Sequence, residues 1–203
     1  MKSAILVLSG PSGAGKSSII SAAAEQIGDF YFSISSTSRQ AREGELDGRE
    51  YHFVSKDEFE RGIEAGEFLE YAVVHGNYYG TSLKPVHEAL SAGRLVIFDI
   101  DVQGFHLAMD AMGDLITSAF ILPPSLSVLE SRLRSRSTDS DEVVSRRIEN
   151  AKIEIGELGA YDFVIVNDDL EVAAQKFVAV ANAARLKLSN KERKEFGKEW
   201  LSS

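Results

Sequence analysis

The sequence of 203 residues contains no cysteine. This absence excludes a disulfide framework, a thiolate-bound zinc site and a cysteine nucleophile, and it is compatible with a reducing compartment. An excess of positive charge is also absent, because 22 lysine and arginine residues against 31 aspartate and glutamate residues give a formal net charge of −9. Such a chain has no global positive field that would hold nucleic acid or an anionic membrane surface. An anionic ligand must therefore be bound by a local cluster of basic groups.

Long hydrophobic runs are missing as well. The apolar run at residues 4–8 is too short for the core of a signal peptide or for a membrane span, and Gly10-Pro11 end it. We therefore expect a soluble cytoplasmic protein without nucleic-acid or membrane partners. Hydrophobic residues make up 44% of the chain. This is enough for a core, and the length predicts one domain of ordinary size.

Short apolar runs alternate with helical patterns along much of the chain, which is typical of a parallel sheet with crossover helices. The first apolar run is followed by a helix predicted at residues 16–27, which ends at Gly28. The sequence therefore predicts the α/β class, with a parallel sheet flanked by helices. Buried strands are predicted at residues 4–8, 95–100, 119–122 and 163–166.

Two stretches interrupt this alternation, and such interruptions are often binding or moving parts. Residues 33–92 are polar, with short alternating strands and a helix that begins at Ser55, which forms a capping-box pattern with Glu58. Residues 125–156 are helical and rich in arginine and acidic side chains. A charged helix is predicted at residues 190–203.

The motif that carries the most chemical information lies between the first predicted strand and helix. It matches the phosphate-binding pattern G-x-x-x-x-G-K-[ST] as Gly10-Pro11-Ser12-Gly13-Ala14-Gly15-Lys16-Ser17. Its glycines let backbone N–H groups turn toward an anion, and the helix N-terminus adds its dipole. Lys16 would contact the β and γ phosphates, and the Ser17 hydroxyl would bind Mg²⁺. The flanking strand and helix favour this phosphate loop over a glycine-rich turn that binds nothing.

A phosphate loop needs a carboxylate near its magnesium ion, usually at the end of a neighbouring apolar strand. Asp99 ends such a strand, and Asp101 follows two residues later. Because side chains alternate along a strand, these two acids could serve different ligands. For each of the two, the alternative is an acidic side chain that is exposed to solvent at a strand end and binds no ligand.

Arg39 and Arg42 lie three residues apart after a short predicted strand. Two guanidinium groups can together neutralise a phosphate dianion, and the hydroxyls of Tyr51 and Tyr79 could join them. Taken alone, the arginines are more often surface charges, and the tyrosines are more often half-buried packing residues.

Further motifs accompany these residues in one order along the chain: Phe68-Leu69-Glu70, Gly76-Asn77-Tyr78-Tyr79-Gly80-Thr81, Asp99-Ile100-Asp101-Val102-Gln103-Gly104, Pro123-Pro124-Ser125, Arg132-Leu133 with Arg136, and Val166-Asn167-Asp168-Asp169. Together with the phosphate loop and residues 35–45, they resemble the guanylate kinase family over about residues 5–181. The resemblance implies a P-loop NTPase core with a small mixed α/β GMP-binding insert and a helical lid over ATP. The core would comprise residues 1–32, 93–124 and 157–203, the insert residues 33–92 and the lid residues 125–156.

The resemblance also implies Mg²⁺-dependent transfer of the γ-phosphoryl group of ATP to GMP, giving ADP and GDP, with the choice between GMP and dGMP left open. ATP would be bound by Gly10, Pro11, Ser12, Gly13, Ala14, Gly15, Lys16, Ser17 and Ser18, and the metal by Ser17 and Asp99. GMP would be bound by Ser35, Arg39, Arg42, Glu45, Tyr51, Glu70, Tyr79, Thr81 and Asp101. Catalytic charge would come from Lys16, Arg39, Arg132, Arg136 and Arg147, whereas Arg134 and Arg146 are expected in surface ion pairs.

Two other functions remain open at this point. A P-loop kinase acting on a sugar phosphate would have no use for Glu70, Thr81 and Asp101, which suit the hydrogen-bond donors and acceptor of guanine. A non-catalytic, peptide-binding module of guanylate-kinase-like sequence would not need the intact Gly15-Lys16-Ser17. The sequence does not predict the oligomeric state.

Overall fold

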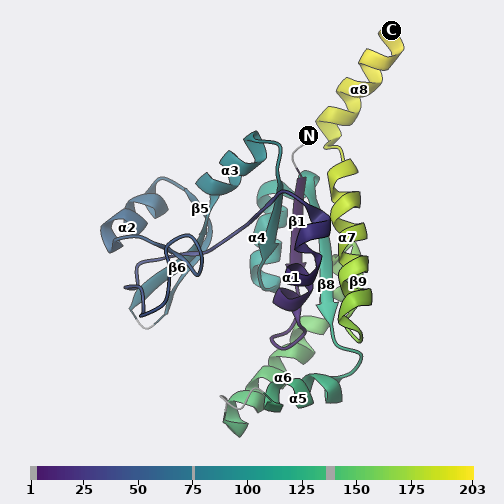
Figure 1. Cartoon of the computed structure of the whole chain (residues 1–203). Coiled ribbons are helices and arrows are strands. Elements are labelled where there is room, and N and C mark those ends of the chain that lie inside the picture. Colours follow the sequence, from purple (N-terminus) through teal and green to yellow (C-terminus); the bar gives the residue numbers. More distant parts are fainter. Residues whose placement is uncertain (1–3, 75, 136–139) are drawn as a thin grey trace.

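The computed structural model describes residues 4–74, 76–135 and 140–203 (Figure 1). Its central sheet has five parallel strands, and the first of them in sequence, β1 (Ala4–Ser9), lies in the middle and is buried along its whole length. A parallel strand covered on both faces is expected to be this apolar. The strand order is β2 (Phe30–Phe32), β7 (Leu95–Asp99), β1, β8 (Ile116–Leu122) and β9 (Phe163–Val166).

The α/β fold with a parallel sheet is confirmed, and so are the four predicted strands. The structure adds β2, which the sequence patterns did not predict. This strand has three residues, lies at the sheet edge and pairs with β7 from Phe30 to Phe32. Three residues are too few to show a period, so the pairing rather than the local sequence makes this segment a strand.

Helices cover both faces of the central sheet. Because side chains alternate along β1, Leu6 and Leu8 face α1 (Lys16–Ile27) and α7 (Leu170–Leu186), whereas Ile5 and Val7 belong to the cluster on the opposite face. That second cluster includes residues of α3 (Leu83–Ser91) and α4 (Val102–Met112). The short helix η1 (Gly113–Leu115) leads from α4 into β8, and η2 (Leu158–Ala160) precedes β9.

A second sheet stands off to one side of the central sheet (Figure 1). Its strand order is β4 (His52–Phe53), β3 (Ser36–Thr37), β6 (Asn77–Ser82) and β5 (Phe68–Val74). The helix α2 (Lys56–Glu64) packs on this sheet, where the ring of Phe59 stacks on Phe68 at 4.1 Å and on Tyr78 at 5.1 Å between ring centroids. The capping box predicted for Ser55 and Glu58 is present at the start of α2.

Two further helices, α5 (Leu126–Ser135) and α6 (Asp141–Ile155), lie together beyond the carboxyl end of the central strands (Figure 1). They share a small apolar cluster of Leu129, Leu133, Val144 and Ala151. The predicted C-terminal helix is α8 (Asn190–Ser202), which projects away from the rest of the chain. Among the described residues, none of the helices has the length and apolar character needed to cross a membrane.

Candidate active site

The phosphate loop connects β1 to α1 and packs tightly against two other parts of the central sheet. Gly10 has φ +139°, and a Cβ atom there would lie 2.0 Å from the carbonyl oxygen of Ile121 in β8. Gly15 has φ +93°, and a Cβ atom there would lie 2.3 Å from Nδ2 of Asn167. Both positions therefore require glycine, because a side chain would displace the loop from its neighbours.

Lys16, the first residue of α1, lies across this loop. Its Nζ donates a hydrogen bond to the carbonyl oxygen of Gly10 (2.6 Å) and lies 3.6 Å from Oδ1 of Asp99, at the end of β7. Burial raises the pKa of the Asp99 carboxyl group, and the nearby ammonium of Lys16 offsets part of that rise. These groups line a cavity of about 160 Å³ with Pro11, Ser12, Gly13, Gly15, Ser17 and Ser18. The structure thus brings both metal-binding candidates and all the ATP-binding candidates except Gly10 and Ala14 together around one cavity.

Two arginines reach this region from the helices beyond it, Arg147 to the phosphate loop and Arg132 to the segment that follows β9. Nη1 of Arg147, in α6, donates to Oγ of Ser12 (2.9 Å). Nη2 of Arg132, in α5, donates to the carbonyl oxygen of Asn167 (2.9 Å). Arg136 lies outside the described residues. Arg134 pairs with Glu130 and Asp141 on the surface, as predicted.

Asn167 is a buried residue of this site to which the sequence patterns assigned no role. It follows β9, and its Nδ2 donates to the carbonyl oxygen of Ala14 within the phosphate loop (2.8 Å). A second cavity, of about 310 Å³, is lined by Asn167, Asp168, Arg132 and the loop residues Gly13, Gly15 and Ser18. Asn167 lies within the sequence motif Val166-Asn167-Asp168-Asp169, which could have drawn attention to it. Only the pairing of strands in the central sheet, however, brings Asn167 next to the phosphate loop.

Arg39 is the centre of a second polar group, on the second sheet. Its side chain is only 14% exposed, and its Nη2 donates to Oε1 of Glu45 (2.9 Å). The guanidinium carbon lies 5.5 Å from the ring centroid of Tyr51, whose ring in turn contacts that of Tyr79 at 5.8 Å. Oε2 of Glu45 accepts from the backbone N–H of Arg42 (2.8 Å), and the Arg42 side chain is exposed. The hydrogen bond from Arg39 is the main cause of the lowered pKa of Glu45.

The candidates for guanine recognition fall on both sheets. Glu70 in β5 and Thr81 in β6 are neighbours, since the Thr81 hydroxyl donates to Oε1 of Glu70 (2.7 Å). Ser35 precedes β3 and is half-buried. Asp101, by contrast, follows β7 of the central sheet and caps α4 by accepting from the backbone N–H of Gly104 (2.8 Å).

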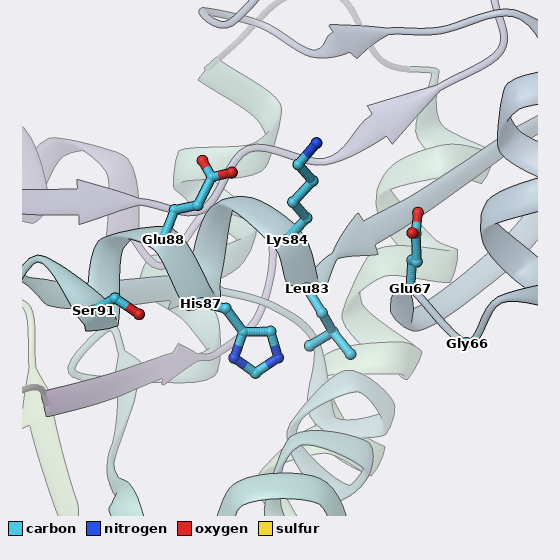
Figure 2. Close-up of a pocket in the computed structure, with 7 residues that line it drawn as sticks. All are labelled: Gly66, Glu67, Leu83, Lys84, His87, Glu88 and Ser91. Carbon is cyan, nitrogen blue, oxygen red and sulfur yellow. The ribbon is translucent and has the colours of Figure 1, made fainter.

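A larger cavity, of about 610 Å³, lies away from these groups, at the junction of α3 with the segment before β5. Figure 2 shows that its polar side chains do not converge: Lys84 and Glu88 point to one side of α3 and His87 to the other. Its lining includes neither the residues of the phosphate loop nor Lys16 and Asp99. Its size alone therefore does not make it the active site.

Comparison with known proteins identifies the family of the chain. A family model described as guanylate kinase matches residues 2–184. The guanylate kinase of Sulfurimonas denitrificans is 57% identical over 97% of this chain and 96% of its own, and that of Campylobacter jejuni strain RM1221 is 46% identical over 94% of each. The crystal structure of guanylate kinase from Anaplasma phagocytophilum superposes with a TM-score of 0.66 at 33% identity, covering 94% of this chain and 89% of that one. The resemblance seen in the sequence motifs is confirmed, and the chain belongs to the guanylate kinase family.

Proposed function

We propose that the protein transfers the γ-phosphoryl group of ATP to GMP, giving ADP and GDP, with Mg²⁺ as cofactor. Guanylate kinases are ATP:GMP phosphotransferases, and the family assignment makes the chain an enzyme of this class. The observation that supports the reaction best is the meeting of Lys16, Asp99 and Arg147 at one phosphate loop. A separate polar group around Arg39, with Glu45 and Tyr51, would bind the second phosphate-bearing substrate.

The reaction requires the two substrates to be aligned and their negative charge to be offset. It does not require a general base, because the accepting group is already a phosphate anion. The backbone N–H groups of the loop residues other than Pro11, which has none, would hold the phosphates of ATP. Lys16 would leave the carbonyl oxygen of Gly10 and move its ammonium to the β and γ phosphates. Arg132 and Arg147 would offset charge on the transferring group, and Arg136 is assigned the same role by the sequence motif.

The residues at the loop fit a magnesium ion. The Ser17 hydroxyl and the Asp99 carboxylate line the same cavity, and both are hard oxygen donors. In the described part of the chain there is no group of three or more histidine, cysteine or acidic side chains that could hold a metal. Two protein donors suit Mg²⁺ bound to a nucleotide, since this ion keeps water and phosphate oxygens as its other ligands. Bound there, it would neutralise charge shared between the β and γ phosphates.

GMP would bind to the second sheet, within an insert of residues 33–92. Arg39, Arg42, Tyr51 and Tyr79 would hold its phosphate. Glu45 would act on the phosphate indirectly, because its carboxylate holds the Arg39 side chain and the Arg42 backbone. Ser35, Glu70, Thr81 and Asp101 would face the base.

Glu70→Gln is expected to raise the KM for GMP about tenfold while leaving that for AMP nearly unchanged. Thr81 holds one oxygen of Glu70, so the carboxylate is fixed where it can accept from N1–H and the exocyclic amine of guanine. A hydrogen bond to a charged group contributes about 1.5–3 kcal/mol, and the amide loses one acceptor. Steady-state kinetics with both nucleotides measure the effect, with the exposed Glu67→Gln as control. An equal rise in the KM for GMP and for AMP would show that Glu70 does not recognise the base.

Residues 125–156 would form a lid over ATP, and we expect both the lid and the insert to close when the substrates bind. Reacting atoms must come within about 3–3.5 Å of each other with water excluded, which an open site does not achieve. Small-angle scattering of the free protein, of the GMP complex and of the complex with GMP and a non-hydrolysable ATP analogue should show a radius of gyration that falls in that order. An unchanged radius across all three samples would contradict closure.

The other two functions are not favoured by the comparisons, in which the relatives are guanylate kinases. A coupled assay of ADP release over a panel of nucleoside monophosphates and sugar phosphates tests the proposal directly. Release that depends on GMP supports it, and release with a sugar phosphate or with no acceptor contradicts it. The cytoplasmic location and the absence of nucleic-acid and membrane partners stay predictions.

A further inference from the structure

Asn167 lies against the phosphate loop, and the proposed reaction gives it no part. It follows β9 and is only 5% exposed. Its backbone is held on both sides, because its N–H donates to the carbonyl oxygen of Leu122 (2.8 Å) and its carbonyl oxygen accepts from Nη2 of Arg132 (2.9 Å). The side chain of Asn167 therefore starts from a fixed point and extends to the loop.

The side-chain amide of Asn167 contacts one peptide group of the loop, the one that joins Ala14 to Gly15. Nδ2 donates to the carbonyl oxygen of Ala14 (2.8 Å), and both residues are buried. A trans peptide group is planar, with its carbonyl and its N–H pointing to opposite sides. Holding the Ala14 carbonyl toward Asn167 therefore turns the N–H of Gly15 away from Asn167. Gly15 also lines the cavity in which the phosphates would bind.

The conformational freedom of Gly15 makes such a restraint necessary. Its φ is +93°, and glycine adopts positive and negative values of φ about equally readily. Without a restraint, the peptide group that precedes Gly15 could rotate and carry its N–H out of place. A stiffer residue cannot replace this glycine, because a Cβ atom there would lie 2.3 Å from Nδ2 of Asn167. The side chain that requires glycine at this position is thus also the one that holds the peptide group.

An amide suits this position better than the acidic side chains that follow it. Asp168 and Asp169 are exposed, and Asp169 caps α7 by accepting from the backbone N–H of Val172 (2.9 Å). An ionised carboxylate in place of the Asn167 amide would have no hydrogen to donate to the Ala14 carbonyl. It would also bring a negative charge close to a bound phosphate. A neutral donor satisfies the carbonyl and does not repel the ligand.

We propose that Asn167 is a positioning residue for the phosphate donor. Its amide fixes the peptide group between Ala14 and Gly15, and with it the N–H of Gly15, before the nucleotide binds. Preorganisation of this kind favours binding, because less conformational freedom is lost when the ligand arrives. The inference rests on the proposed function, since it takes the triphosphate of ATP as the ligand of the loop.

Titration with ATP in the presence of Mg²⁺ tests this role. In Asn167→Ala, which removes the donor and adds no charge, the Kd for ATP should rise about tenfold, the loss expected for one hydrogen bond. Asn167→Leu fills similar space without a donor and should show the same rise, so the test holds even if the smaller side chain destabilises the protein. Asn182→Ala, at an exposed asparagine of α7, is the matched control and should bind ATP normally.

GMP provides the readout that general damage to the fold would move. Because GMP would bind to the second sheet, its Kd measured without ATP should change less than about twofold in the Asn167 variants, well under 1 kcal/mol. A protein that had lost its fold would bind neither nucleotide. Equal losses of affinity for ATP and GMP would therefore overturn the positioning role.

Inorganic tripolyphosphate separates positioning from direct contact with the nucleotide. It can occupy the phosphate loop but has no base or ribose, so positioning predicts that its Kd rises in Asn167→Ala by the same factor as that of ATP. An unchanged Kd for tripolyphosphate beside a raised Kd for ATP would show that Asn167 contacts the base or ribose, and would overturn the proposal. So would a loss of affinity confined to Asn167→Asp, because it would come from the introduced negative charge.

These titrations do not depend on phosphoryl transfer. If the unaltered protein binds ATP but releases no ADP in the presence of GMP, the proposed function fails, and the titrations still decide the role of Asn167. If the unaltered protein releases ADP with GMP and Asn167→Ala binds ATP normally, the proposed function stands and the positioning role is overturned.

Discussion

Lys16→Ala is expected to lower kcat by about 10²–10³-fold, the loss that follows removal of one preorganised group that stabilises charge in a transition state. The ammonium lies between the carbonyl oxygen of Gly10 and the carboxylate of Asp99, at the cavity where the phosphates would bind. Without it, the loop keeps its backbone N–H groups but loses the positive charge nearest to the transferring group. Substrate binding should suffer less than turnover, because the loss falls on the transition state.

The fold should survive this substitution. Lys16 does not belong to the apolar clusters of the core, and its contacts are polar. Thermal unfolding followed by circular dichroism checks the fold, and stopped assays of ADP formation check turnover. Lys198→Ala on α8, an exposed lysine away from the site, is the matched control and should retain full activity. A Lys16→Ala enzyme that keeps more than about a tenth of normal turnover would contradict the phosphate-loop assignment.

Arg39→Ala is expected to raise the KM for GMP about 100-fold. The guanidinium is held in place by Glu45 and lies against the ring of Tyr51, so little conformational freedom remains to be lost on binding a phosphate. Charge-assisted hydrogen bonds of this kind contribute about 1.5–3 kcal/mol each, and a bidentate arginine makes two. Because the proposed contact is to phosphate, the binding of dGMP and AMP should be weakened by a similar factor.

Arg49→Ala provides the control for this prediction. Arg49 lies in the same segment and pairs with Glu50, but its side chain is largely exposed. The KM for GMP should therefore stay unchanged in this variant. A change of less than about threefold in Arg39→Ala would remove Arg39 from the phosphate site, since it corresponds to well under 1 kcal/mol. Isothermal titration with GMP separates a loss of binding from a loss of turnover.

Much of the nucleotide-binding core was predictable because its signals are local. The motif from Gly10 to Ser17 is contiguous, and the strand before it and the helix after it place its functional groups in the loop. The run that ends at Asp99 is likewise apolar enough to predict a buried strand with an acid at its end. The capping box at Ser55 could be predicted from four consecutive residues of the sequence.

Other features depend on residues far apart in the chain. β2 is a strand only because it pairs with β7, and Asn167 reaches the phosphate loop only because β8 and β9 close the sheet beside β1. Glu45 was assigned to GMP by the resemblance, but its hydrogen bonds to Arg39 and Arg42 required the folded turn. Likewise, the composition of α8 predicts a charged helix, whereas its exposed apolar face depends on where Asp114 holds it. Sequence alone therefore determined the local elements and the candidate residues for binding phosphate, because backbone propensity and periodicity act over a few residues. The tertiary structure decided which of those residues meet and which apolar surfaces remain exposed, because packing and sheet pairing join segments that the sequence separates.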